Sequence, residues 1–122
     1  MTQENKELLI KDLSARLPYG VKIRVEYPFM EEKDWYPEDL YGLDLRRDLI
    51  AGTSIRTEEI KPYLFPLSSM SKEQEQEEYE ICKYYIPGYE SNLIDFYNKN
   101  HFDYRGLIEK GLAIDATGLN IY

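Results

Sequence analysis

The sequence predicts a single α+β domain: an N-terminal helix, a small curled antiparallel sheet, and then two or three C-terminal helices. Three features predict this class. Leucines recur at helical spacing near the start, an alternating segment follows directly, and a helix-capping pattern opens a second helical region after residue 70. An SH3-like barrel is one form that such a sheet can take. With 122 residues the chain is one domain long, with a sheet-containing part of about 1–61 and a helical part of about 67–122.

The first helix is predicted over residues 4–17. Its apolar positions share one helical face and are separated by charged and polar residues; they are Leu8, Leu9, Leu13 and Leu17. Pro18 and Gly20 follow at once and end the segment. This pattern is typical of an amphipathic helix that covers one side of a core.

The sheet is predicted from alternation. Apolar residues occupy every second position of the segment Val21, Ile23, Val25 and Tyr27. Residues 29–39 show no sustained period and are interpreted as a long connection. A hairpin is predicted over residues 41–55, and residues 55–60 are a candidate edge strand. Pro62 and Pro66 then impose an extended path that could cover the open edge of the sheet or lead into the next helix.

The helical part begins with Ser71, three positions before Gln74, which is the spacing of a capping box. This helix is predicted to end at Pro87-Gly88, with its glutamates facing away from a packed side formed by Tyr79, Cys82, Tyr85 and Ile86. A further helix is predicted over residues 91–98, and a short helical turn near Leu107 followed by extended chain.

Charge and composition exclude several functions. Fifteen basic and 23 acidic residues give a net charge of −8, which disfavours direct binding of nucleic acid because like charges repel. Cys82 is the only cysteine, so we expect no disulfide within the chain and no thiolate zinc cluster. The residues match no metal or nucleotide motif, so no cofactor is predicted. The sequence shows no signal peptide and no apolar run of membrane-spanning length, which favours a cytoplasmic protein without membrane contact.

His101 is the one residue whose ordinary pKa lies near neutrality, and Asp103 could orient it as a general base. The alternative is structural: the imidazole caps the end of the preceding helix or packs on an aromatic ring. Arg105 could pair with a carboxylate, and Gly106 is expected to adopt a positive φ. The sequence leaves both interpretations of His101 open.

Tyrosine is unusually abundant, with 12 residues in 122. Such rings either cover a small core with their hydroxyls pointing outward or mark an interface, because tyrosine joins a large apolar ring to a polar group. At least one group is expected to be exposed, either Tyr84, Tyr85 and Tyr89 around Pro87 or Tyr63 with Phe65 between Pro62 and Pro66. The candidate partner-binding residues are Tyr63, Phe65, Tyr84, Tyr85, Tyr89, His101, Asp103 and Arg105.

Two segments carry a resemblance to a known family. They are Ile-Lys-Pro-Tyr-Leu-Phe-Pro-Leu-Ser-Ser-Met at residues 60–70 and Asn-His-Phe-Asp-Tyr-Arg-Gly-Leu-Ile at residues 100–108. Both resemble segments of a family of uncharacterised small proteins from gut anaerobic bacteria and their phages and mobile elements. The order of helix, sheet region, acidic helix and closing segment is also similar. The resemblance implies a cytoplasmic protein of a bacterial host or its phage and implies no activity.

These observations lead to three hypotheses. The first is a non-enzymatic adaptor or regulatory protein that binds another protein, which follows from the surplus tyrosine and the missing catalytic, metal and nucleotide motifs. The second is an acidic mimic of nucleic acid that inhibits a host DNA-binding protein. The third is a small enzyme that uses His101 and Asp103. Formation of a homo-oligomer is compatible with each of them.

Overall fold

The computed structural model of the protein describes residues 2–26, 30–40, 60–84 and 86–122. In chain order, its helices and strands are α1 (Gln3–Arg16), β1 (Lys22–Val25), β2 (Pro37–Asp39), β3 (Ile60–Pro66), α3 (Lys72–Cys82), α4 (Tyr89–Lys99), β4 (Phe102–Asp103) and β5 (Ile114–Asp115). The predicted α+β class is therefore confirmed. The hairpin predicted over residues 41–55 lies outside the described residues, as does all but the last residue of the strand predicted at 55–60.

Helix α1 forms where the leucine spacing predicts it. The hydroxyl of Thr2 caps its N-terminus by accepting a hydrogen bond from the Asn5 amide at 3.1 Å. Leu9 and Leu13 are buried, so the predicted apolar face packs on the core. The chain leaves the helix through a single turn that ends at Gly20, whose φ of 74° lies in the left-handed region.

The sheet is small, open and mixed. Its strands lie in the order β2-β1-β3-β4, and β5 also pairs with β3. Strand β1 is antiparallel to β2 and to β3, as predicted, but β3 is parallel to β4 and to β5. The prediction of a wholly antiparallel sheet is wrong for these two pairs. Parallel neighbours need a long crossover, and here the segment that carries α3 and α4 supplies the connection from β3 to β4.

Two segments predicted to lie outside the sheet are strands within it. Strand β3 occupies the middle of the sheet, so the prediction that this segment covers a sheet edge is wrong, although it does lead into α3. Pro62 lies opposite Ile23 of β1, and pairing with β5 begins one residue later, at Tyr63. The segment predicted as a connection ends in β2, where Glu38 lies opposite Ile23. Proline and acidic residues are uncommon in strands, so the sequence did not indicate these two strands. Pairing with β1 stabilises both of them.

The core lies between α1 and the sheet, and the segment after β4 closes it. Ile23 and Val25 of β1 are buried while Lys22 and Arg24 are only partly buried, which confirms the alternation predicted for this strand. Leu107 and Leu112, from the C-terminal segment, belong to the same cluster. The buried apolar residues of this cluster are Leu9, Leu13, Val21, Ile23, Val25, Leu40, Ile60, Leu64, Leu107, Leu112 and Ala113.

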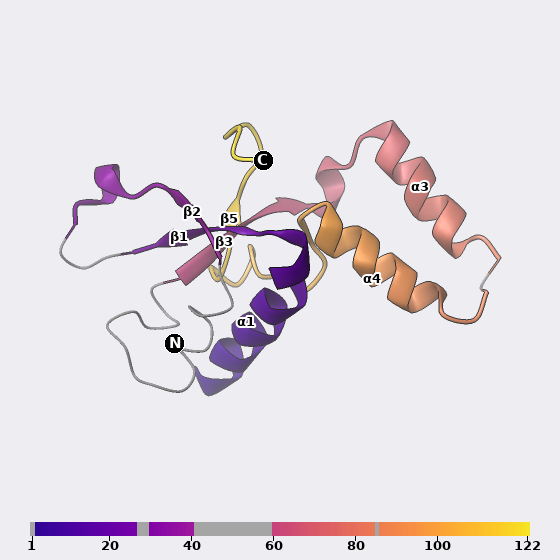
Figure 1. Cartoon of the computed structure of the whole chain (residues 1–122), viewed down its shortest axis with the longest axis horizontal. Helices are drawn as coiled ribbons and strands as arrows, with labels where there is room; N and C mark the ends of the chain where they lie inside the picture. Colours follow the sequence, from indigo (N-terminus) through magenta and orange to yellow (C-terminus); the bar gives the residue numbers. More distant parts are fainter. Residues whose placement is uncertain (1, 27–29, 41–59, 85) are drawn as a thin grey trace.

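Helices α3 and α4 form a hairpin that extends away from the sheet (Figure 1). The predicted capping box is present: the Gln74 amide donates to the Ser71 hydroxyl and the Ser71 amide donates to the Gln74 side chain. Helix α4 contacts α1 and β4, whereas no residue of α3 is buried. Helix α3 is therefore largely exposed to solvent, apart from the side that contacts α4.

Candidate functional site

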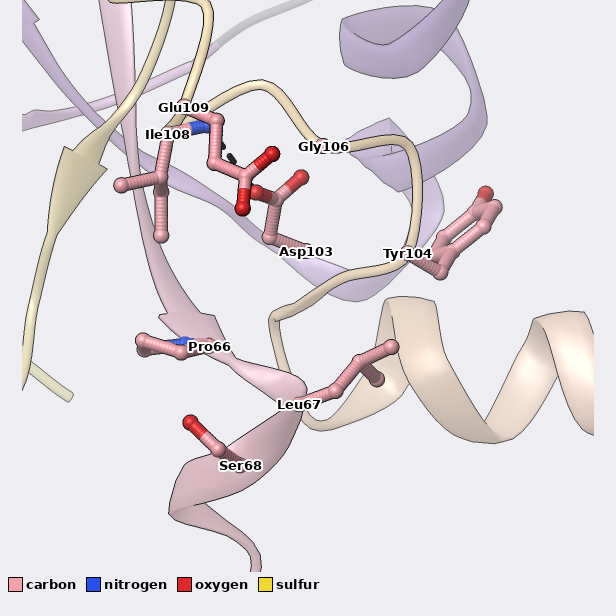
Figure 2. Close-up of a pocket in the computed structure, with 8 residues that line it drawn as sticks. All are labelled: Pro66, Leu67, Ser68, Asp103, Tyr104, Gly106, Ile108 and Glu109. Carbon is pink, nitrogen blue, oxygen red and sulfur yellow. Dashed lines mark hydrogen bonds between the residues drawn. The ribbon is translucent and has the colours of Figure 1, made fainter.

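The two segments singled out in the sequence lie side by side in the fold. Strand β3 pairs with β4, and the Phe65 amide donates a hydrogen bond of 2.8 Å to the carbonyl of His101. Between the end of β3 and the loop after β4 lies a pocket of about 360 Å³ (Figure 2). Its lining residues are Pro66, Leu67, Ser68, Asp103, Tyr104, Gly106, Ile108 and Glu109. Both segments thus contribute to one concave surface.

Asp103 shapes the loop beside this pocket. The residue is buried, and its two carboxylate oxygens accept hydrogen bonds of 2.9 Å, one from the Leu107 amide and one from the Ile108 amide. Gly106 adopts a φ of 72°, as predicted, and this lets the chain turn back toward the carboxylate. Asp103 therefore holds the rim of the pocket in place.

Arg105 belongs to a charge network that joins this loop to α1. Its Nη1 donates to Asp12 at 2.8 Å, which agrees with the predicted pairing with a carboxylate. Asp12 also accepts from Nε of Arg16 at 2.8 Å, and both of these α1 side chains are fully buried. The guanidinium of Arg16 donates in turn to the carbonyl of Phe102 at 2.6 Å. Such pairing compensates the cost of burying charge and fixes α1 against β4.

His101 is half-buried and stacks on Tyr122, with ring centroids 3.7 Å apart and planes 13° from parallel. Its φ of 62° lies in the left-handed region directly after α4. Burial, assisted by the positive charge of Arg16, lowers the pKa of His101 to about 4. Its Nδ1 is buried and has no hydrogen-bond partner among the described residues. The geometry agrees with the structural interpretation, in which the imidazole packs on an aromatic ring.

His101 and Asp103 have different partners. The carboxylate of Asp103 binds two backbone amides, and His101 stacks on Tyr122. The pocket of Figure 2 is lined by Asp103 and not by His101. A histidine that acts as a general base oriented by a carboxylate needs a hydrogen bond between the imidazole and that carboxylate. The arrangement of His101 and Asp103 therefore gives no specific support to the hypothesis of a small enzyme.

Tyr63 and Phe65 are neighbours in β3 with different exposure. Tyr63 is buried, which removes it from any contact surface, and its carbonyl accepts a hydrogen bond of 2.6 Å from the Tyr122 hydroxyl. Phe65 is half-buried against the ring of Tyr122 at a centroid distance of 5.7 Å. It also lines a second, smaller pocket of about 140 Å³ with Ser69, Gln74, Asn100 and Phe102. Of Tyr63 and Phe65, at most one ring, that of Phe65, is therefore accessible to a partner.

The residues predicted around Pro87 lie where the α3–α4 hairpin turns. Tyr84 is 69% exposed, with the Lys83 ammonium 4.8 Å from its ring centroid. Tyr89 is half-buried, and Tyr85 lies outside the described residues. Of the two candidates on this hairpin that the structure describes, Tyr84 and Tyr89, Tyr84 has the ring that is largely open to solvent.

The prediction that Tyr79 and Ile86 lie on a packed side is wrong. Each is 60% exposed, and Ile94 of α4 is 42% exposed. Helix α3 instead turns a different face toward α4, since Glu78 accepts a 2.7 Å hydrogen bond from the Tyr97 hydroxyl. Burial and this hydrogen bond raise the pKa of Tyr97 well above its ordinary value. The partly buried residues of α3 are Gln74, Glu78, Ile81 and Cys82, and their spacing of three and four residues could have indicated this face.

The glutamates of the acidic run, Glu73 to Glu80, all lie on α3, with Glu80 paired to Lys83. Because they share one helix, the geometry gives no specific support to a mimic whose carboxylates would be spaced along a stripe like phosphates. Within the described part of the chain, no group of three or more His, Cys, Asp or Glu side chains is placed to hold a metal ion. No helix in the same part is long and apolar enough to cross a membrane.

Comparisons of the chain with protein-family models, with curated proteins and with solved structures give no match.

Proposed function

We propose that the protein is a non-enzymatic adaptor or regulatory protein that binds another protein through the α3–α4 hairpin. The observation that carries the proposal is the concentration of exposed apolar side chains on this hairpin. Tyr79, Tyr84 and Ile86 are 60%, 69% and 60% exposed. Exposed aromatic and aliphatic side chains grouped on one element are typical of protein interfaces.

The lack of buried residues in α3 also supports this proposal. An isolated helix of this length, 11 residues, is marginal in water, and most helices in proteins are stabilised by an apolar face packed on the core. No residue of α3 is buried, so its stability depends on its capping box and its contacts with α4. A partner that covers α3 would supply the burial that the chain itself does not provide.

The charge of the hairpin indicates the chemistry of the partner surface. Glu73, Glu75 and Glu77 are exposed. A partner with lysine or arginine around an apolar centre would complement this surface and would be attracted to it over distance. A bacterial host or its phage, and the cytoplasm, form the proposed setting.

The proposal is tested by affinity capture from a lysate of the source organism with the double variant Tyr79→Ser/Ile86→Ser. Both side chains are exposed, so the variant is expected to fold. The matched control is Tyr36→Ser/Leu119→Ser, whose side chains are exposed outside the α3–α4 hairpin. We expect the wild type and the control to capture the same partner and the hairpin variant to capture at least about tenfold less, as for hot-spot residues.

Equal capture by the hairpin variant and the control would contradict the proposal. So would the absence of any reproducible partner for a chain that is monomeric in sedimentation. Self-association that the hairpin variant abolishes would instead identify the partner as a second copy of the chain, a homo-oligomer bound through the same surface.

A further inference from the structure

The pocket in Figure 2 combines apolar walls with two carboxylates. Pro66 and Leu67 at the end of β3 lie across from Ile108, and Asp103 and Glu109 supply the charged groups. The volume of about 360 Å³ lies within the range of roughly 300–1,000 Å³ that is usual for ligand sites. The pocket is open to solvent on one side, so a group bound in it can stay attached to a larger molecule.

The two carboxylates retain the capacity to bind a donor. Each oxygen of Asp103 accepts one backbone amide, but a carboxylate oxygen has two lone pairs, so each can accept one more hydrogen bond. Glu109 is exposed and forms no ion pair or side-chain hydrogen bond with another described residue. Figure 2 shows Asp103 and Glu109 among the residues that line the pocket.

The cations nearest in the sequence do not neutralise this end of the pocket. Arg105 directs its guanidinium to Asp12 at 2.8 Å, and Lys110 does not line the pocket. A cation bound in a pocket that two carboxylate side chains line is attracted to both of them. A positively charged hydrogen-bond donor therefore complements the charge of this pocket.

We infer that this pocket receives the side chain of an arginine or lysine from the partner protein. The charged head binds Asp103 and Glu109, and the methylene stem packs on Leu67. Arginine fits best, because its planar guanidinium can donate to two carboxylates at once. The inference rests on the proposed function for the class of partner, and the pocket borders the α3–α4 hairpin, because Tyr104 lines it and stacks on Tyr97 of α4 at 5.4 Å.

The test uses two small probes that differ mainly in charge, Nα-acetyl-arginine amide and its neutral analogue Nα-acetyl-citrulline amide. Each is titrated into the wild-type protein while amide chemical shifts are followed by NMR. We expect arginine to produce saturable shifts at Ser68, Gly106 and Glu109, and citrulline to bind at least about twofold more weakly, as for an exposed ion pair. Raising the salt concentration should weaken the arginine shifts, because ions screen charges at this open site.

The variant Glu109→Gln keeps the size of the side chain and removes its charge, and the residue is exposed, so the fold is preserved. We expect it to weaken arginine binding about two- to fivefold, and the control Glu90→Gln, on α4 outside the pocket, to leave it unchanged. Equal binding of the two probes, no shifts at the pocket, or equal effects of both variants would overturn the inference. The result is independent of the capture experiment, since arginine can bind when no partner is found, and a partner can bind the hairpin when arginine does not bind the pocket.

Discussion

Arg16 is the largest completely buried side chain in the described part of the protein. It donates to Asp12 of its own helix and to the carbonyl of Phe102, which lies 86 positions further along the chain. Its guanidinium also lies 5.3 Å from the ring centroid of Tyr104. A single charged side chain thus connects α1, β4 and the loop that borders the pocket. Its burial is favourable only while all these partners are in place.

Replacing Arg16 with methionine is expected to lower the free energy of unfolding by about 3 kcal/mol, because the buried Asp12 loses one of its two partners and the Phe102 carbonyl loses its donor. Urea denaturation measures the change. The matched control is Lys33→Met, which removes an exposed ion pair with Glu31 and should cost less than about 1 kcal/mol. Equal effects of both variants would contradict the role assigned to the buried network.

His101 makes stability depend on pH. Its pKa in the folded protein is lowered to about 4 from an ordinary value of 6.5, so the unfolded chain binds a proton first as the pH falls. The contribution of the neutral imidazole is complete above pH 6.5 and is lost progressively as the pH falls toward 4. NMR titration of the ring should show no protonation midpoint between about pH 5 and pH 7. An unburied histidine has its midpoint near pH 6.5, within that range.

The variant His101→Asn tests the same effect on stability, because asparagine tolerates the left-handed backbone of this position. Between about pH 7 and pH 5, the wild type should lose more unfolding free energy than the variant does. The comparison stays above the range in which most carboxylates titrate. Parallel curves for the two proteins would show that His101 does not contribute to the pH dependence.

At the scale of an element, the start of helix α3 is specified by the local sequence, whereas the face that it turns to α4 depends on tertiary contacts. Its start could be predicted because the capping box involves only Ser71 and Gln74, three residues apart. The face that it turns to α4 could not be predicted in the same way. Tyr79 is the larger and more apolar side chain, yet Glu78 faces α4, because the Tyr97 hydroxyl supplies a hydrogen bond to that carboxylate. Polar pairing outweighs hydrophobic patterning at this contact.

The variant Ser71→Ala should lower the stability of α3 by about 1 kcal/mol, because the Gln74 amide loses its acceptor. Amide hydrogen exchange in α3 measures this loss locally, and the protection factors of its amides should fall about fivefold. The control Ser91→Ala changes an exposed serine in the first turn of α4 and should leave exchange in α3 unchanged. If α3 exchanged equally in both variants, the capping box would not be stabilising the helix.

At the scale of the whole molecule, the side chain of Tyr122 ties the C-terminal segment to the sheet. Its hydroxyl donates to the Tyr63 carbonyl at 2.6 Å and accepts from the Lys22 amide at 2.9 Å. Burial raises the pKa of this hydroxyl to about 12, although part of the residue is exposed. The same ring stacks on His101, so one side chain joins β1, β3 and the segment after α4.

The variant Tyr122→Phe keeps the ring contacts and removes both hydrogen bonds. It is expected to lower the free energy of unfolding by about 1–2 kcal/mol, because the Tyr63 carbonyl and the Lys22 amide lose a partner. Thermal and urea denaturation measure the effect. The control Tyr36→Phe, at an exposed position, should change stability by less than about 0.5 kcal/mol. A loss in the control as large as in Tyr122→Phe would contradict this assignment.

The elements that could be predicted are those whose signals are local: the leucine period of α1, the alternation of β1 and the capping box of α3 each involve residues within a few positions of one another. The position of β3 in the middle of the sheet could not be predicted, nor could the pocket that Asp103 and Glu109 line together with Leu67. Helical and strand periods follow from the geometry of neighbouring residues, whereas strand pairing and pocket formation depend on contacts between residues far apart in the chain, which no local spacing specifies.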